Sequence, residues 1–76
     1  MNHENKVARA YSYIGFVTSD PAWRKDHWVD IPPQAYDEAS EAGADGDQLE
    51  VGAIFDRHFA RIAHLEAETK FGVKLS

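Results

Sequence analysis

The sequence predicts a small α+β domain in which a two-stranded antiparallel sheet packs on a short helix and a long C-terminal helix, in the order β-β-α-α. Residues 47–71 contain no proline and carry apolar side chains at helical spacing. Residues 6–18 are rich in β-branched and aromatic side chains, and residues 27–31 alternate between two faces. We expect the 76 residues to form one domain, with residues 1–5 frayed.

The first strand is expected over residues 6–18, KVARAYSYIGFVT. β-branched and aromatic residues favour strands. Gly15 inside the segment predicts a bulge or the close approach of another backbone. A helix over residues 4–13 is the alternative, because VARAYSYI also fits a period of 3.6.

The second strand is expected over residues 27–31, where successive side chains alternate in character. Asp20 and Pro21 supply turn chemistry, and we expect the polar residues 22–26 to form a loop. Pro32 and Pro33 end the strand because proline has no N–H to donate.

A short helix is predicted over residues 33–42, since proline suits the first position of a helix. The long helix is predicted over residues 47–71. Asp47 is its N-cap, and Glu50 completes a capping-box pattern. Gly72 follows the helix, where a left-handed residue is needed.

Two neighbouring faces of the long helix are largely apolar, although Asp56 and Lys70 interrupt the second of them. A helix with so little polar surface buries two sides. We expect one side to cover the N-terminal half of the chain and the other to meet a partner helix or a second copy. The broad apolar arc contains Val51, Ile54, Phe55, His58, Phe59, Ile62 and Leu65, and the small-residue arc contains Leu49, Gly52, Ala53, Ala60, Ala63 and Ala67.

Composition excludes several classes of protein. The net charge is −5, so the chain repels phosphate backbones and nucleic-acid binding is disfavoured. It has no cysteine for disulfides or thiolate metal sites. No apolar run approaches the roughly 20 residues that span a membrane, and the N-terminus lacks the pattern of a signal peptide. These features predict a cytoplasmic protein without a membrane segment.

No catalytic, cofactor-binding or metal-binding residues are predicted, and we expect no enzymatic activity. His58 and His64 are six residues apart, which points their rings about 120° apart on a helix instead of together on one metal ion. Neither a nucleophile-and-base pattern nor a glycine-rich phosphate loop is present.

An interaction surface is the remaining candidate site. Trp23 lies in the polar segment and is the candidate exposed anchor, because tryptophan is typical of binding hot spots. The alternative is that Trp23 folds back over the edge of the sheet. Tyr13 belongs to an aromatic surface too large for one small core. Arg57, Arg61 and His64 form a cationic strip, which supports the alternative function of nucleic-acid binding.

Part of the chain resembles a small bacterial family. Residues 55–62, FDRHFARI, with Leu65 and Lys70 after them, resemble the last helix of the domain of unknown function fourteen-eighty-eight. Val29, Asp30 and Ile31, followed by residues 33–39, resemble its last strand and short helix. The resemblance covers residues 28–70, implies the strand–strand–helix–helix order and implies no activity.

The sequence thus predicts a protein-interaction or regulatory module. Its partner is an unidentified protein, and the long helix is the surface through which it self-associates as a homodimer. This expectation depends on the two apolar faces of the long helix in a chain of only 76 residues.

Overall fold

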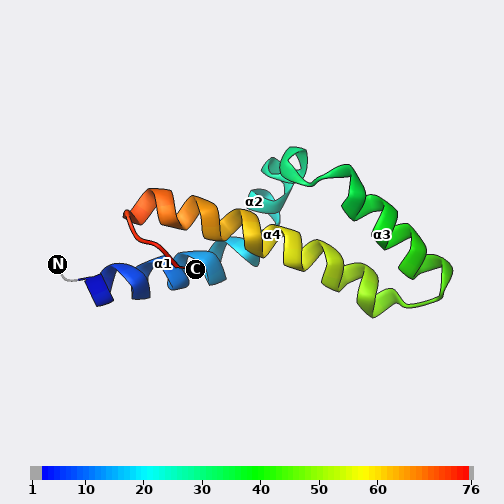
Figure 1. Ribbon diagram of the computed structural model, residues 1–76, viewed down its shortest axis with the longest axis horizontal. Helices are drawn as coiled ribbons and strands as arrows, with labels where there is room; N and C mark the ends of the chain where they lie inside the picture. The colour runs from blue at the N-terminus through cyan, green and yellow to red at the C-terminus, as the bar shows by residue number, and fades with distance from the viewer. Residues whose placement is uncertain (1–2, 76) are drawn as a thin grey trace.

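The computed structural model describes residues 3–75 and contains no β-strand within them. The predicted α+β class and its two-stranded sheet are therefore wrong, and the fold is all-α (Figure 1). In chain order the elements are α1 (His3–Thr18), α2 (Pro21–Asp26), the 3-10 helix η1 (Trp28–Asp30), α3 (Pro33–Ala44) and α4 (Gln48–Phe71).

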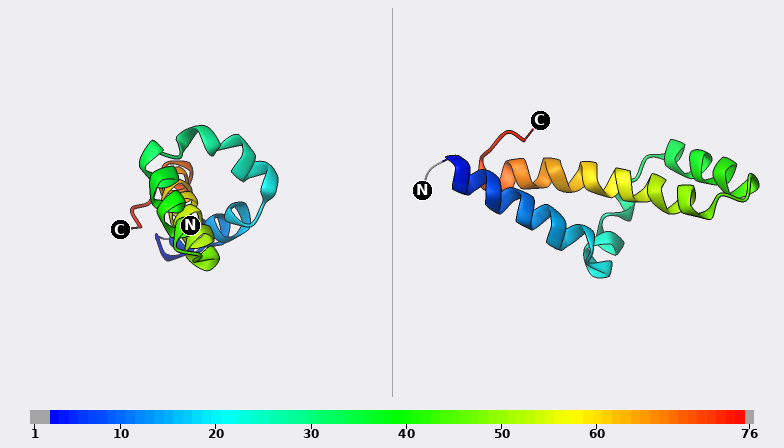
Figure 2. Two further views of the ribbon diagram at one scale, coloured as in Figure 1. Left: turned by 90° about the vertical axis from the view of Figure 1, so that its right-hand side faces the viewer. Right: turned by 90° about the horizontal axis from the view of Figure 1, so that it is seen from below.

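Helix α4 is the spine of the molecule (Figure 1). Helix α1 packs along its C-terminal half and α3 along its N-terminal half, on opposite sides, while α2 and η1 cross between them (Figure 2). The Cα radius of gyration is 14.3 Å and the extents are 49 × 20 × 20 Å. A compact chain of this length has a radius of about 11 Å. The protein is therefore elongated.

Helix α1 replaces the predicted first strand. Its buried positions Ala10, Ile14 and Val17 follow helical spacing and face α4, whereas alternation would bury Ala8, which is exposed. The alternative of a helix over residues 4–13 is confirmed, and the helix continues to Thr18. A Cβ built on Gly15 would meet no atom of another element within 4 Å, so the predicted close approach of another backbone does not occur, and Gly15 lies within α1 instead of in a bulge. Of the residues expected to fray, 1 and 2 lie outside the described range and 3–5 begin α1.

The segment between α1 and α3 also differs from the prediction. Residues 22–26 lie in α2 instead of a loop, because Asp20 accepts the Ala22 N–H (3.0 Å) and Pro21 takes the first helical position. The predicted second strand is η1 and a bend. Trp28 packs its ring against Phe55 (centroids 5.3 Å apart) and Tyr36 (6.2 Å), so tertiary aromatic contacts override the short alternation.

Both predicted helices are confirmed. Helix α3 runs two residues beyond its predicted end, and α4 begins one residue after its predicted start and ends at the predicted residue. The Asp47 carboxylate accepts the Glu50 N–H (3.0 Å), and Gly72 has φ 65°, as the caps predict. The second half of the capping box is absent, since the Asp47 N–H donates to the Ala42 carbonyl (2.9 Å).

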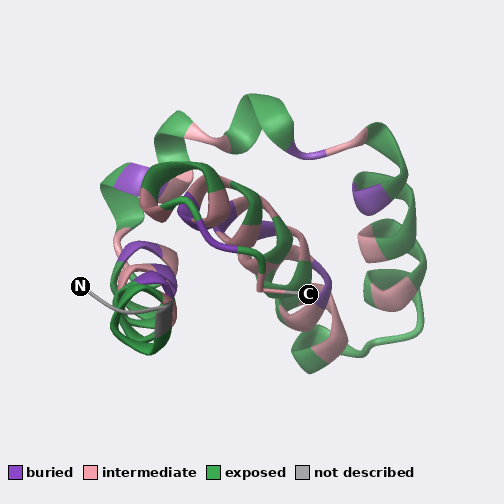
Figure 3. Ribbon diagram, turned by 60° about the vertical axis from the view of Figure 1, so that its left-hand side comes forward, coloured by how far each residue is buried: buried purple, intermediate pink, exposed green. Residues whose placement is uncertain are grey.

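The core lies along the faces that α1, α2 and α3 turn toward α4 (Figure 3). Ala63 and Ala67 are fully buried on the side of α4 that α1 covers. A helix therefore does pack on the small-residue arc at Ala63 and Ala67. This helix is α1 of the same chain and not a helix of a partner. Phe59 is the one large side chain among the described residues that is fully buried.

Candidate interaction surface

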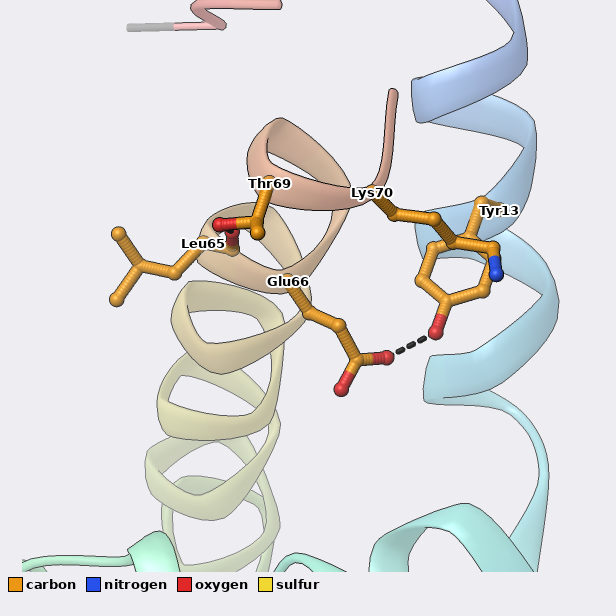
Figure 4. Close-up of a pocket in the computed structure, with 5 residues that line it drawn as sticks. All are labelled: Tyr13, Leu65, Glu66, Thr69 and Lys70. Carbon is orange, nitrogen blue, oxygen red and sulfur yellow. Dashed lines mark hydrogen bonds between the residues drawn. The ribbon is translucent and has the colours of Figure 1, made fainter. Parts of the chain in front are cut away.

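Glu66 on α4 joins three residues from the N-terminal part of the chain. The Tyr13 hydroxyl of α1 donates to Glu66 Oε1 (Figure 4). Trp23 Nε1–H of α2 donates to the same oxygen at 3.1 Å, and His27 Nε2 lies 2.9 Å from Oε2. One carboxylate thus fastens both α1 and the end of α2 to the spine.

Each ring nitrogen of His27 faces an acceptor. Nε2 faces Glu66, and Nδ1 lies 2.7 Å from the Trp23 carbonyl. Only the doubly protonated imidazolium can donate both hydrogen bonds. Its ring also stacks on the Trp23 indole, with centroids 4.2 Å apart. Burial lowers the pKa of His27, but the Trp23 carbonyl and the Glu66 carboxylate outweigh burial, and the pKa lies above its ordinary value of 6.5.

The same contacts shift the pKa of Glu66 and the pKa of Tyr13. Burial would raise the pKa of Glu66, but hydrogen bonds from Tyr13, Trp23 and His27 hold it below the ordinary value of 4.5. Burial and the neighbouring Glu66 carboxylate raise the pKa of Tyr13 to about 12. Near neutral pH the cluster therefore contains an ionised carboxylate and a neutral phenol.

Stability should depend on pH in a defined way. Because the folded pKa of His27 exceeds 6.5, its stabilisation is complete below pH 6.5 and is lost as the pH rises through the folded pKa. Because the folded pKa of Glu66 is below 4.5, its contribution is complete above pH 4.5 and is lost as the pH falls through the folded pKa. Urea unfolding should show maximal stability between pH 4.5 and 6.5.

The variant His27→Gln provides the control for this profile. It should flatten the decline on the alkaline side, because no imidazolium is left to titrate. A wild-type free energy of unfolding that increased from pH 6.5 to pH 8 would contradict the assignment.

The charged groups of this cluster are hydrogen-bonded within the protein. Both oxygens of Glu66 and both ring nitrogens of His27 have hydrogen-bond partners in the protein. Across residues 3–75, no group of three or more histidine, cysteine, aspartate or glutamate side chains is placed to hold a metal ion.

Two hollows lie beside this cluster along α4. The first, of about 540 Å³, is lined by Tyr13, Leu65, Glu66, Thr69 and Lys70 (Figure 4). The second, of about 390 Å³, is lined by His27, Asp30, Arg61, Ile62, Leu65 and Glu66. Since both are lined by Leu65 and Glu66, they form one depression, which we term the α4 groove. Leu65 stands in its middle with 57% of its surface exposed.

The α4 groove continues the side of the spine that α3 covers. Val51, Ile54 and His58 are buried or half-buried in the half of α4 against which α3 packs. At heptad spacing the next positions on that side are Arg61 and Leu65, and both are exposed. The apolar arc predicted from the sequence is therefore covered over its first half and open at its end.

The structure does not bring the five predicted surface residues together at one site. Trp23 is buried (9% exposed) and folds back onto α4, so it is no exposed anchor; Tyr13 is half-buried and joins it on Glu66. The cationic strip is not one site. Arg57 pairs with Glu50 (2.8 Å), Arg61 lines the groove, and His64 meets the edge of Tyr11 (5.9 Å).

Sequence reasoning missed three residues of this region: Glu66, His27 and Leu65 as an exposed position. Glu66 carried a usable signal. It lies four residues after Ile62 and seven after Phe59, which places a carboxylate on the apolar arc. A charged side chain on a buried face needs hydrogen-bond partners. Those partners lie more than thirty residues away, so the sequence did not show them.

No protein-family model, curated protein or solved structure matches the chain. The resemblance to the bacterial family therefore stays a prediction. Among the described residues, no helix is both long enough and apolar enough to cross a membrane.

Proposed function

We propose that this protein is a non-enzymatic protein-interaction module that self-associates through the α4 groove. The observation that carries the proposal is Leu65, a large apolar side chain that is 57% exposed between two hollows. Leu65 lies on the same side of α4 that α3 covers along the N-terminal half of that helix. A cytoplasmic setting fits the cysteine-free composition.

The surface of the molecule supports this proposal. The accessible surface is 5159 Å², whereas a compact monomer of this mass exposes about 4,700 Å². A small core and an extended shape leave several large apolar side chains in water, and association is a common way to cover them. These side chains are Tyr11, Phe16, Trp28, Val29, Tyr36, Leu49 and Leu65.

Nucleic-acid binding has weaker support. Glu50 neutralises Arg57, which leaves Arg61 as the one arginine of the predicted strip without a carboxylate partner in the described part of the chain. A net charge of −5 opposes approach to phosphates. No observation favours this function over self-association.

The variant Leu65→Glu tests the proposal. Wild-type protein should show a concentration-dependent dimer in sedimentation velocity experiments at micromolar concentration. Leu65→Glu should weaken that dimer at least about 30-fold, since burying a leucine stabilises by roughly 2 kcal/mol.

Leu49→Glu is the matched control. Leu49 is even more exposed (89%) but lies about 160° away around α4, so its replacement should leave the dimer intact. A wild-type protein that stays monomeric at all concentrations, or a Leu65→Glu dimer of wild-type strength, would overturn the proposed function.

A further inference from the structure

The charges of this protein are segregated along its length. Residues 32–50 carry six acidic side chains and no lysine or arginine: Asp37, Glu38, Glu41, Asp45, Asp47 and Glu50. They form α3, the turn after it and the start of α4, which together make one end of the molecule (Figure 1). Four of the eight lysines and arginines lie toward the other end, in α1 and in the second half of α4: Lys6, Arg9, Arg61 and Lys70.

The outer face of α3 is acidic. Ala35, Ala39 and Ala42 are its buried or half-buried residues, so the opposite face points away from the spine. Asp37 and Glu41, four residues apart, lie on that opposite face. Both are exposed, and neither side chain has an ion-pair partner in the described part of the chain.

The α4 groove offers the complementary charge. Arg61 and Lys70 flank Leu65 on its two sides along the helix. Neither cation reaches a carboxylate within residues 3–75: Arg61 contacts only His58 (3.5 Å), and the Lys70 ammonium lies over the Tyr13 ring (5.6 Å from its centroid). The groove is thus lined by two unpaired cations and also by two carboxylates, Asp30 and Glu66, of which Glu66 is already hydrogen-bonded to Tyr13, Trp23 and His27.

Shape and position agree with this charge pattern. Along one side of α4, α3 forms a ridge over the first half and the groove forms a hollow over the second half. An antiparallel second copy would bring its ridge over the hollow, and its acidic end beside the cationic end. A parallel copy would place ends of like charge together. The antiparallel arrangement also closes after two copies, because both use the same surface.

We propose that two copies pair antiparallel about a two-fold axis, each seating the acidic outer face of α3 in the α4 groove of the other. Asp37 and Glu41 of one copy then face Arg61 and Lys70 of its partner, around Leu65. This inference rests on the proposed self-association and assigns its geometry. Because the facing charges lie at a rim, the dimer should weaken as salt is added.

Charge exchange tests the geometry. The first variant combines Arg61→Glu with Lys70→Glu, and the second combines Asp37→Lys with Glu41→Lys. In a homodimer of either variant, like charges face each other in both symmetric contacts. The dimer affinity of each variant should therefore be lower by about tenfold or more. An equimolar mixture of the two variants should form a heterodimer of nearly wild-type strength, since both contacts are complementary again.

A control variant with Lys6→Glu and Arg9→Glu has the same net charge as the first variant but alters α1, and it should dimerise as wild type does. Circular dichroism verifies that each variant is folded. If the wild-type protein dimerises but the charge variants keep wild-type affinity, or if the mixture fails to restore it, this geometry is overturned while self-association stands. If the wild-type protein is a monomer, the proposed function itself has failed.

Discussion

Replacing Phe59 with alanine is expected to cost about 3–5 kcal/mol of folding free energy. Phe59 is 1% exposed, and its ring is the meeting point of three elements. Trp28 lies 5.2 Å and Trp23 6.0 Å from it between centroids, and the Arg24 guanidinium lies 4.9 Å above it. A domain of this size has a total stability of about 5 kcal/mol. At most about 2 kcal/mol of stability should therefore remain, and far-UV circular dichroism should show the variant unfolding at a much lower urea concentration than the wild type.

Phe16→Ala is the matched control for this loss. It removes the same side chain from α1, where Phe16 is 71% exposed, and should change stability by less than about 0.5 kcal/mol. If Phe59→Ala unfolded with a cooperative transition as stable as that of the control, the contacts around this ring would not hold the core together.

Glu66→Ala should produce the second-largest loss, about 2–3 kcal/mol. The change leaves the donors of Tyr13, Trp23 and His27 without their shared acceptor. Because Glu66 is partly exposed, water replaces some of these bonds and limits the cost. Urea unfolding measures the loss. Glu4→Ala, which removes an exposed acidic side chain from α1, should change the free energy of unfolding little.

The variant Glu66→Gln separates charge from hydrogen bonding. The amide oxygen can still accept a hydrogen bond, so the loss should be smaller than for alanine. The pKa of His27 should fall, because the carboxylate that favours its imidazolium is gone. NMR titration of His27 measures this shift. An unchanged pKa together with unchanged stability would show that Glu66 does not bind these side chains in solution.

The sequence was sufficient where local chemistry determines structure. Asp47 and Gly72 mark the two ends of α4, and both act as predicted. Pro33 likewise marked the start of α3. Helix ends have side-chain and backbone signals of short range, which a single sequence displays fully.

The sequence was insufficient where the period of a strand and the period of a helix both fit the same residues. Residues 6–18 satisfy alternation and a 3.6-residue period almost equally, and their β-branched and aromatic content favoured the strand. The packing of this segment against the buried alanines Ala63 and Ala67 favours the helix. Residues 27–31, which follow α2, form an even shorter segment, and the aromatic contacts of Trp28 determine its conformation.

The candidate surface was found only in part. Tyr13 and Arg61 were singled out and do border the α4 groove. Trp23 was proposed as an exposed anchor, but its indole nitrogen reaches Glu66 and the ring is buried. Leu65 was assigned to the covered arc, because periodicity identifies a face of a helix without showing how far along it a neighbour extends.

The most direct test of the seating of α3 in a partner's groove is a paramagnetic relaxation measurement between copies. The chain has no cysteine, so Ser40→Cys on α3 takes a single spin label. Labelled protein is mixed with an unlabelled copy enriched in ¹⁵N, and only contacts between copies are seen. We expect broadening of the amide signals of residues 61–70. Broadening confined to residues 48–58, or none at concentrations where the dimer forms, would contradict the account.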